Sequence, residues 1–305
     1  MAAAEPRVSI GLPVYNGEKY LAASIESVLA QTMPDFELVV SDNASTDATE
    51  EICRSFADGD PRIKYSRNER NVGGARNYNL VFSRAVAPIF SWHTHDDVIS
   101  DTYLARCLEP LDADRSVVMT YPRIVYIDAT GATIAEQRVA DLSIAEDGVP
   151  ERVRRLVELE LASKDIFWAG AFGVARREAV ANTQLLGGYN AADQVLVFQL
   201  LLQGKFVQVD GASYYRRDHP EASMVAHPEP KDVLRWFDPD AEKRFVLPHW
   251  RLLAEHVKSV RRVGLTPADE LRTHLNVSRR FRKEWRNFPG DVKVAARDLR
   301  NSRRV

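Results

Sequence analysis

Residues 88–100 read P-I-F-S-W-H-T-H-D-D-V-I-S, so that an apolar run passes within a few residues into the adjacent carboxylates of Asp96 and Asp97. The apolar run predicts a strand. Carboxylates where a strand ends can hold a hard cation such as Mg²⁺ or Mn²⁺, with substrate phosphate and water as the remaining ligands. An Asp-Asp pair before an apolar residue is also typical of a helix cap. The residues that precede this stretch decide between the two interpretations.

Upstream of this stretch, strand patterns alternate with helix patterns. Leu21, Ile25, Val28 and Leu29 fall at i, i+4, i+7 and i+8, which is one apolar face of a helix. The expected strands are 7–12, 36–40 and 63–65, and the expected helices are about 21–31, 48–56, 75–85 and 101–111. This alternation predicts an α/β fold with a mainly parallel sheet and helices on both faces. In such folds ligands bind beyond the carboxyl ends of the strands.

Length and composition narrow the class of protein. A chain of 305 residues with 45% hydrophobic and 28% charged residues can bury a sizeable core, as one large domain or one domain with an extension. No run approaches the ~20 apolar residues that span a bilayer, and no secretory leader pattern is present, so we expect a cytoplasmic protein. Only Cys53 and Cys107 are present, and we expect both to be buried, reduced thiols.

Polar side chains follow each predicted strand and form a candidate nucleotide site. They are Pro13, Tyr15 and Glu18 after the first strand, Asp42 and Asn43 after the second, and Arg76 in the first turn of the third helix. A carboxylate can accept from N3–H of uracil or thymine or from N1–H of guanine, whereas N3 of cytosine is itself an acceptor. Tyrosine can stack on a base, and arginine can reach a base edge or a phosphate. Each residue alone also fits a turn, a cap or surface charge, and their joint placement favours the nucleotide site.

Four blocks of sequence carry a resemblance to a known family. They are V-S-I-G-L-P-V-Y-N-G-E-K-Y-L at 8–21, L-V-V-S-D-N-A-S-T-D at 38–47, N-V-G-G-A-R-N at 71–77 and H-T-H-D-D at 93–97. In this order and spacing the chain resembles the nucleotide-sugar half of glycosyltransferase family 2, which has the GT-A fold. The resemblance covers about the first 130 residues. It implies metal-dependent transfer of sugar from a nucleoside diphosphate sugar, usually with inversion.

The same resemblance implies roles for individual residues. Pro13, Tyr15 and Glu18 would line the nucleotide pocket, with Asn43 beside them, Asp42 would bind the base, and Arg76 would contact base or phosphate. Asp97 would ligate Mn²⁺ or Mg²⁺, and Asp96 would hold ribose or the donor sugar. Family members often read D-x-D-D here, but Thr94 stands at the leading position of this chain. Metal binding is then either weaker or helped by a ligand from elsewhere.

The second half of the chain adds two candidates. Asp193 follows a small-residue loop, 187–192, and opens a nearly all-apolar predicted helix, 195–202. A carboxylate there can be a helix cap worth about 0.3–1 kcal/mol, but the resemblance implies the catalytic base, and we adopt that assignment. A predicted strand, 206–215, is followed by R-R-D-H, in which His219 is a candidate further metal ligand. His93 and His95 are weaker candidates, and a surface histidine is the ordinary alternative.

Charge is distributed unevenly along the chain. Residues 243–305 contain 17 Lys and Arg against 6 Asp and Glu, a net charge of +11 in a chain whose total is −2. Basic and aromatic residues cluster there as Arg279, Arg280, Arg282, Lys283 and Arg286 with Phe281, Trp285 and Phe288. This mixture favours contact with an anionic membrane surface. A solvated helix face is the ordinary alternative, and nucleic acid is the poorer one because no nucleic-acid-binding pattern accompanies it.

The sequence therefore predicts a GT-A domain over 1–225, with a nucleotide-sugar half to about 130 and an acceptor half over 131–225, and a helical basic extension over 226–305. The predicted activity is metal-dependent, inverting transfer from a UDP-sugar, or from a GDP- or dTDP-sugar, to a glycan or lipid-linked hydroxyl in glycan or cell-envelope polysaccharide synthesis. The alternatives are a non-catalytic nucleotide-sugar or glycan binding protein and a nucleotidyltransferase. A dehydrogenase is disfavoured because no G-x-G-x-x-G follows the first strand. The sequence is compatible with a homo-oligomer and with peripheral contact at the inner face of the membrane.

Overall fold

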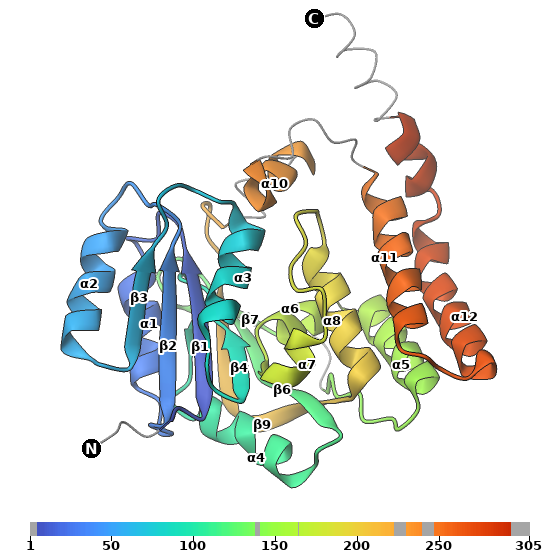
Figure 1. The fold of residues 1–305 in the computed structure, drawn as a ribbon, viewed down its shortest axis with the longest axis horizontal. Coiled ribbons are helices and arrows are strands. Elements are labelled where there is room, and N and C mark those ends of the chain that lie inside the picture. Colours follow the sequence, from blue (N-terminus) through green and yellow to red (C-terminus); the bar gives the residue numbers. More distant parts are fainter. Residues whose placement is uncertain (1–4, 138–140, 164, 223–229, 240–246, 294–305) are drawn as a thin grey trace, which may run out of the picture.

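The computed structural model of the protein describes residues 5–137, 141–163, 165–222, 230–239 and 247–293. The strands within these ranges are β1 Val8–Val14, β2 Phe36–Asp42, β3 Ile63–Arg67, β4 Ile89–Trp92, β5 Val98–Ile99, β6 Val117–Ile127, β7 Thr133–Glu136, β8 Val174–Arg176 and β9 Lys205–Arg217. The helices are α1 Leu21–Leu29, α2 Thr49–Gly59, α3 Gly74–Arg84, α4 Tyr103–Ala113, α5 Val149–Ala162, α6 Asp165–Ala171, α7 Arg177–Ala181, α8 Ala192–Gln203, α10 Pro230–Phe237, α11 Pro248–Arg262 and α12 Pro267–Glu284. Figure 1 shows one central sheet flanked by helices, with α11 and α12 packed beside α8 and α5 on the side away from β3.

The N-terminal half of the sheet is parallel, as predicted. Its strands run in the order β3-β2-β1-β4, with Val8 of β1 opposite Phe36 on one side and Ile89 on the other. Every residue of β1 and β2 is buried, which explains their near-continuous apolar character. β1 continues through Pro13, where the sequence predicted it to stop, and pairs there with Ser41. Both strands therefore deliver their following loops to the same edge of the sheet.

The C-terminal half of the sheet is mixed. β8 is antiparallel to β4 and to β6, β9 is parallel to β6, and the two-residue β5 is antiparallel to β9. β4 ends at Trp92, before the two carboxylates, and β5 begins directly after them. The segment 93–97 therefore crosses the edge of the sheet from its centre to β9. This crossing brings Asp96 and Asp97 beside residues more than 110 positions later in the chain.

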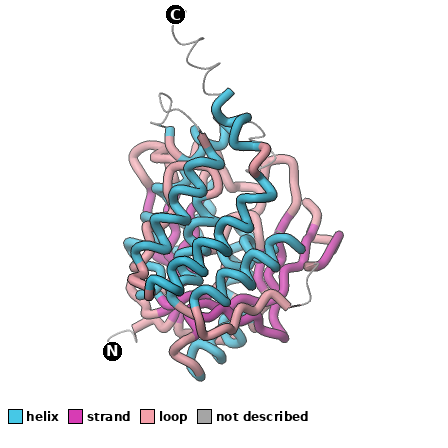
Figure 2. Tube along the Cα trace, turned by 90° about the vertical axis from the view of Figure 1, so that its right-hand side faces the viewer, coloured by secondary structure: helices cyan, strands magenta, loops and turns pink. Residues whose placement is uncertain are grey.

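The C-terminal helices pack against the body of the protein. Leu252 and Val260 of α11 and Val277 and Phe281 of α12 belong to the same buried cluster as the apolar residues of α8. Figure 2 shows the helical layer that results, facing the viewer in front of the sheet. The predicted basic extension therefore shares a hydrophobic core with the preceding domain. No helix in the described ranges combines the length and apolarity that crossing a bilayer requires.

Both cysteines are buried and free, as predicted. Burial raises the pKa of the Cys53 thiol to about 12, and the carboxylates of Asp42, Asp47 and Glu50 act in the same direction. Burial also raises the pKa of Cys107. Because the thiolate is the reactive species, neither side chain has the chemistry of a nucleophile or a metal ligand.

Candidate functional site

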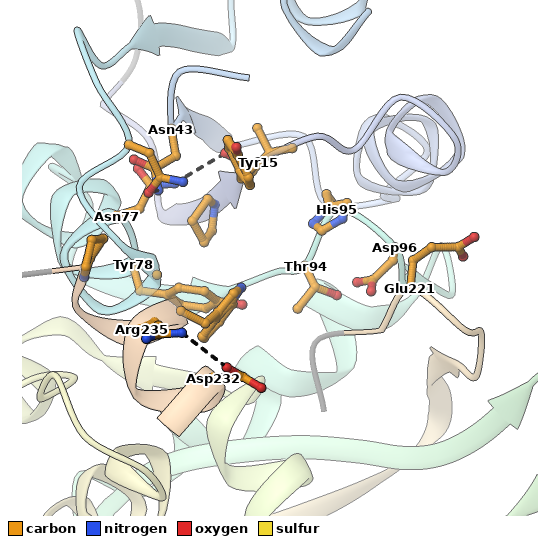
Figure 3. A pocket seen from close by; sticks show the side chains of 16 residues that line it. Tyr15, Asn43, Asn77, Tyr78, Thr94, His95, Asp96, Glu221, Asp232 and Arg235 are labelled. Atoms are coloured by element: carbon orange, nitrogen blue, oxygen red, sulfur yellow. Dashed lines mark hydrogen bonds and ion pairs between the residues drawn. The ribbon is translucent and has the colours of Figure 1, made fainter. Parts of the chain in front are cut away.

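A cavity of about 480 Å³ lies at the carboxyl ends of β1 and β2. Its walls come from the loops after these strands, the start of α3, the crossing segment 93–97 and α10 (Figure 3). Four of the predicted donor residues line it, namely Pro13, Tyr15, Asn43 and Asp96. The position is the one expected for a ligand site in a parallel α/β sheet.

Asparagine side chains hold the loops around the cavity in place. Asn43 accepts from the backbone N–H of Val72 at 2.9 Å and donates to Asn71 at 2.9 Å, so it ties the β2 loop to the loop before α3. Asn16 has a left-handed backbone, φ 51°, and accepts from the N–H of Thr46 at 2.8 Å. Asn16 and Asn43 therefore stabilise turns, which is the ordinary role of asparagine. For Asn43 it coexists with a place in the cavity wall.

Two predicted donor residues have other partners. Glu18 is exposed and accepts from the backbone N–H of Ala48 at 2.9 Å, just before α2, so it stabilises a helix start. Asp42 is fully buried, accepts from Tyr65 at 3.1 Å and forms an ion pair with Arg67 at 3.2 Å. Neither residue is among those that line the cavity. Base recognition by Asp42 stays a prediction, and it would use the acceptor sites that these contacts leave open.

Helix α10 closes one side of the cavity and was missed by the sequence reasoning. Asp232, Arg235 and Trp236 line the cavity from this helix (Figure 3). Arg76, predicted to contact donor, is half-exposed and lies 3.6 Å from Asp238, which follows α10. Such a partner 162 positions away leaves no pattern in the sequence. The apolar-basic spacing of 230–237 between prolines indicates a short helix, but not its place.

Gly73 allows α10 to approach this closely. Its φ of +89° is in the region that favours glycine, and an added Cβ would lie 2.6 Å from the carbonyl oxygen of Phe237. At Gly74 an added Cβ would lie 2.8 Å from the ring of Trp236. The paired glycines of the block at 71–77 therefore make room for α10.

Asp97 anchors the crossing segment to β9. Its Oδ1 accepts from the backbone N–H of Arg217 at 2.7 Å, and its Oδ2 accepts from the hydroxyls of Thr94 at 2.7 Å and Tyr214 at 2.8 Å. The residue is only 4% exposed and does not line the cavity. Burial and the adjacent charge of Asp96 raise its pKa, and these hydrogen bonds oppose that rise. Both oxygens of Asp97 thus already accept hydrogen bonds, and the metal role that the resemblance implies for this residue stays a prediction.

Asp96 is the carboxylate that faces the cavity. Its Oδ2 lies 3.0 Å from Nε2 of His219, whose Nδ1 lies 3.1 Å from Glu221. Burial would raise the pKa of Asp96, but neighbouring His95 and the hydrogen bonds from His219 and Thr94 outweigh it and hold the pKa well below its usual range. The hydrogen bond to Asp96 raises the pKa of His219. Asp96 is therefore an ionised carboxylate paired with the predicted histidine.

The helix-cap interpretation of the carboxylate pair does not hold. The N-cap of α4 is Thr102, and no side chain caps that helix end. The candidates for a divalent cation are Asp96, an oxygen donor in the cavity wall, and His219, an imidazole whose Nε2 now contacts Asp96. Within the ranges the structure describes, no three His, Cys, Asp or Glu side chains are arranged to hold a metal by themselves. His93 is buried, with a pKa lowered by burial to about 4.

Asp193 lies in the first turn of α8, as predicted. Burial raises its pKa, while the backbone N–H groups of the helix start and the charge of Arg280 lower it. The hydroxyl of Tyr78, a residue of α3 that lines the cavity, is buried, and its pKa is raised by that burial and then by the charges of Asp96, Asp97 and Asp193. All three carboxylates thus act on the charge of Tyr78, but of the three only Asp96 is among the residues that line the cavity.

The family model described as "Glycosyl transferase family 2" matches residues 9–182. The chain belongs to glycosyltransferase family 2. It is 31% identical over 134 residues to an uncharacterized glycosyltransferase of Methanocaldococcus jannaschii, covering 43% of this chain and 46% of that one. It is 24% identical over 212 residues to glycosyltransferase GlyG of Streptococcus pneumoniae, covering 69% and 70% of the two chains. The family 2 chain thus spans about half the length of the archaeal relative.

Solved structures agree with the fold of this family 2 chain. S. aureus TarS 1–349 has a TM-score of 0.63 and 18% identity, over 90% of this chain and 71% of that one. GalNAc-T7, solved with UDP, GalNAc and Mn²⁺, has a TM-score of 0.53 and 17% identity, over 70% and 43% of the two chains. At these identities the likeness concerns the GT-A fold alone.

The different surroundings of the two carboxylates predict different costs of substitution. Asp97→Asn places an amide N–H₂ among groups that now donate to the carboxylate, and we expect it to lower the free energy of unfolding by about 1–3 kcal/mol. Asp96→Asn should cost less, because this side chain is 17% exposed at the cavity. Urea denaturation at pH 7.5 measures both. Equal stability of the Asp97→Asn variant and the parent would contradict the anchoring role.

Proposed function

We propose that the protein transfers a sugar from a nucleoside diphosphate sugar to an acceptor hydroxyl, with inversion at the anomeric carbon. The observation that carries the proposal is the Asp96 carboxylate in the wall of a cavity at the carboxyl ends of β1 and β2, in a chain of family 2. TarS, a relative in fold, has been solved with UDP and with UDP-GlcNAc. A UDP-sugar is therefore the first candidate donor, ahead of GDP- and dTDP-sugars.

Asp193 is proposed as the general base. The acceptor oxygen forms a bond to the anomeric carbon as its proton passes to the Asp193 carboxylate, and the bond from that carbon to the diphosphate oxygen breaks. The nucleoside diphosphate leaves with the electron pair. Burial, which raises the pKa of Asp193, brings its proton affinity closer to neutral pH and makes it a better base than an exposed carboxylate. A single displacement of this kind inverts the configuration.

Cavity residues supply the proposed contacts to the nucleotide. Tyr15 is 41% exposed and can stack on the base, and the amides of Asn43 and Asn71 offer polar contacts to it. Arg235 and Trp236 from α10 offer a charge for the diphosphate and a ring for the sugar. Arg235 thus takes the phosphate contact, which the resemblance gave to Arg76 as a contact to base or phosphate.

Asp96 and His219 would hold the divalent cation, Mn²⁺ or Mg²⁺, that the family implies. Bound there with donor phosphate and water completing its ligands, the cation would neutralise charge on the departing diphosphate. This proposal moves the metal from Asp97 to Asp96 and keeps His219. Thr94, at the position of the leading carboxylate, donates to Asp97 instead of offering an oxygen anion.

A panel of sugar nucleotides tests the function. We expect UDP-GlcNAc or another UDP-sugar to raise the melting temperature more with Mn²⁺ than without, and CMP-sugars to have no effect. A ligand at ~100 times its dissociation constant adds ~2.7 kcal/mol, which a thermal-shift scan resolves. GDP- and dTDP-sugars complete the panel. A scan in which no sugar nucleotide stabilises the protein would refute donor binding, and binding without any release of nucleoside diphosphate would point to the non-catalytic alternative.

Replacing Asp193 tests the base. Asp193→Asn keeps shape and a hydrogen-bonding oxygen but removes proton affinity, so kcat should fall by about 10² to 10⁴. Donor affinity should stay near that of the parent, because no nucleotide contact is assigned to this residue. Steady-state release of UDP and titration of UDP binding measure the two quantities. Activity close to that of the parent, or loss of UDP binding together with activity, would place the base elsewhere.

Helices α11 and α12, which we call the C-terminal hairpin, offer a surface for an anionic membrane. An apolar groove of about 390 Å³ is lined by Trp250, Leu253, Phe281, Trp285, Phe288, Pro289 and Val292. Trp250 and Trp285 are 47% and 59% exposed, and the guanidinium of Arg286 lies 5.7 Å from the ring centroid of Trp285. Half-exposed tryptophans beside cations suit the headgroup region of a bilayer. We call this groove, with Arg282, Arg286 and Lys293, the aromatic-basic groove.

Part of the predicted basic cluster belongs elsewhere. Arg280 is buried, and Arg279 lines a different surface hollow with Asn276. Residues 243–246 and 294–305, which carry further basic residues, lie outside the described ranges. In Figure 1 the start of α11 and the end of α12 lie at the same end of the molecule as α10, which borders the cavity. A bilayer on this groove would therefore lie on the side from which a lipid-linked acceptor could reach the site.

Flotation with vesicles tests this surface. The protein should float with phosphatidylserine-containing vesicles at low salt and be released at high salt, since screening weakens the charge attraction. The Trp250→Ser/Trp285→Ser variant should stay in the soluble fraction. Leu271→Ser is the matched control, because Leu271 is 62% exposed on α12 but outside the groove. A parent protein that never floats, or equal loss in variant and control, would contradict the proposal.

A further inference from the structure

Arg280 of α12 is a buried cation at the point where several helices meet. It is 4% exposed, and its Nε lies 2.7 Å from a carboxylate oxygen of Glu160 in α5. One terminal nitrogen lies 2.5 Å from Nε2 of His256 in α11, and the other donates to Oε1 of Gln194 in α8 at 2.5 Å. The guanidinium also lies 5.3 Å from the ring centroid of Phe167 in α6. One side chain of the C-terminal hairpin thus contacts four other helices.

Such a group is expensive to bury. Taking a guanidinium and a carboxylate out of water costs several kcal/mol per ion, and a well-packed apolar pair of similar volume is often at least as stable. His256 accepts from the arginine only as neutral imidazole, and burial followed by the charge of Arg280 lowers its pKa well below the usual value. Stability alone therefore does not account for the arrangement. Its geometry points to the first turn of α8.

The contact with Gln194 ties Arg280 to the proposed base. Gln194 follows Asp193 directly, and α8 begins after Ala191, whose left-handed φ of 62° ends a loop of small residues. Such a loop does not by itself hold a helix start rigidly, whereas a hydrogen bond to Gln194 from a buried guanidinium that Glu160 and His256 hold in place does. We propose that Arg280 is a positioning residue that fixes the first turn of α8 from the C-terminal hairpin and so orients the Asp193 carboxylate. This inference rests on Asp193 as the base.

The charges around Asp193 give a way to distinguish the positioning role of Arg280 from a purely structural role. The charge of Asp193 acts on Tyr78 of α3 and Tyr189 of the preceding loop, and burial raises the pKa of both, so they are neutral near pH 7. Arg280, with Glu160 and His256 behind it, contributes a positive charge that lowers the pKa of Asp193. When that charge is removed, less remains to oppose the rise in the Asp193 pKa that burial causes. The pKa of Asp193 should then rise, and the acid limb of the kcat profile should move to higher pH.

The test uses UDP release from UDP-GlcNAc by the full chain. We expect Arg280→Met to lower kcat by about 10- to 100-fold, since a displacement near 1 Å in a catalytic group can cost that much. The dissociation constant for UDP should stay unchanged, and the acid limb should move to higher pH. Arg280→Lys keeps the charge but not the two-nitrogen fork, so its kcat should fall while its acid limb stays near that of the parent. Arg279→Met removes a neighbouring exposed charge and should match the parent.

A double variant excludes a merely structural effect. Arg280→Met leaves Glu160 buried without its partner and should be unstable, whereas Arg280→Met/Glu160→Gln removes both charges and should regain most of the lost unfolding free energy. The inference predicts that kcat and the acid limb stay altered in this stable double variant. If kcat and the acid limb return to the parental values together with stability, the inference is overturned. Full activity of the Asp193→Asn variant would overturn both the assignment of the base and this inference. If Asp193→Asn is inactive but Arg280→Met keeps the kcat and the pH profile of the parent, only the inference is overturned.

Discussion

The buried carboxylate of Asp97 is the interaction on which the site depends. It joins the segment that leaves β4 to the end of β9 through the backbone N–H of Arg217 and the hydroxyl of Tyr214. A buried carboxylate is tolerated only where hydrogen bonds replace its lost hydration. Those bonds pin the crossing segment across the edge of the sheet, so that the preceding residue, Asp96, faces the cavity beside His219. One carboxylate of the pair thus holds the structure while its neighbour remains available to a ligand.

The C-terminal hairpin has two faces with different physical roles. Its inner face completes the hydrophobic core and buries Arg280 among α5, α6, α8 and α11. Its outer face carries the aromatic-basic groove, where half-exposed tryptophans stand beside cations. The net positive charge of the last 63 residues therefore does not describe one uniform surface. Such a hairpin links the aromatic-basic groove on its outer face to the first turn of α8, which Arg280 contacts on its inner face.

Local pattern was sufficient for most of the elements. The spacing of Leu21, Ile25 and Val28 predicted α1, and the apolar run at 117–127 coincides with β6, because period and burial are properties of contiguous residues. The parallel half of the sheet followed from alternation alone. The mixed half did not, because the antiparallel pairing of β8 with β4 and of β5 with β9 joins segments far apart in the chain. The sequence also predicted which residue types lie near the site, but not which member of the adjacent pair Asp96 and Asp97 faces the cavity.

By itself, the sequence determined the α/β alternation, the edge of the sheet where the site lies, and the candidates Tyr15, Asn43, Asp96, Asp193 and His219. Periodicity and the polar residues that follow apolar runs account for all of these except Asp193, whose role the family resemblance implied. Only the tertiary structure decided that Asp96 and not Asp97 faces the cavity, that Glu18 serves a helix start, and that α10 supplies Arg235 and Trp236. Whether a carboxylate faces solvent or a buried hydroxyl depends on partners more than 100 residues away, such as Tyr214. No local pattern encodes that partner, because it is brought close only when the sheet has formed.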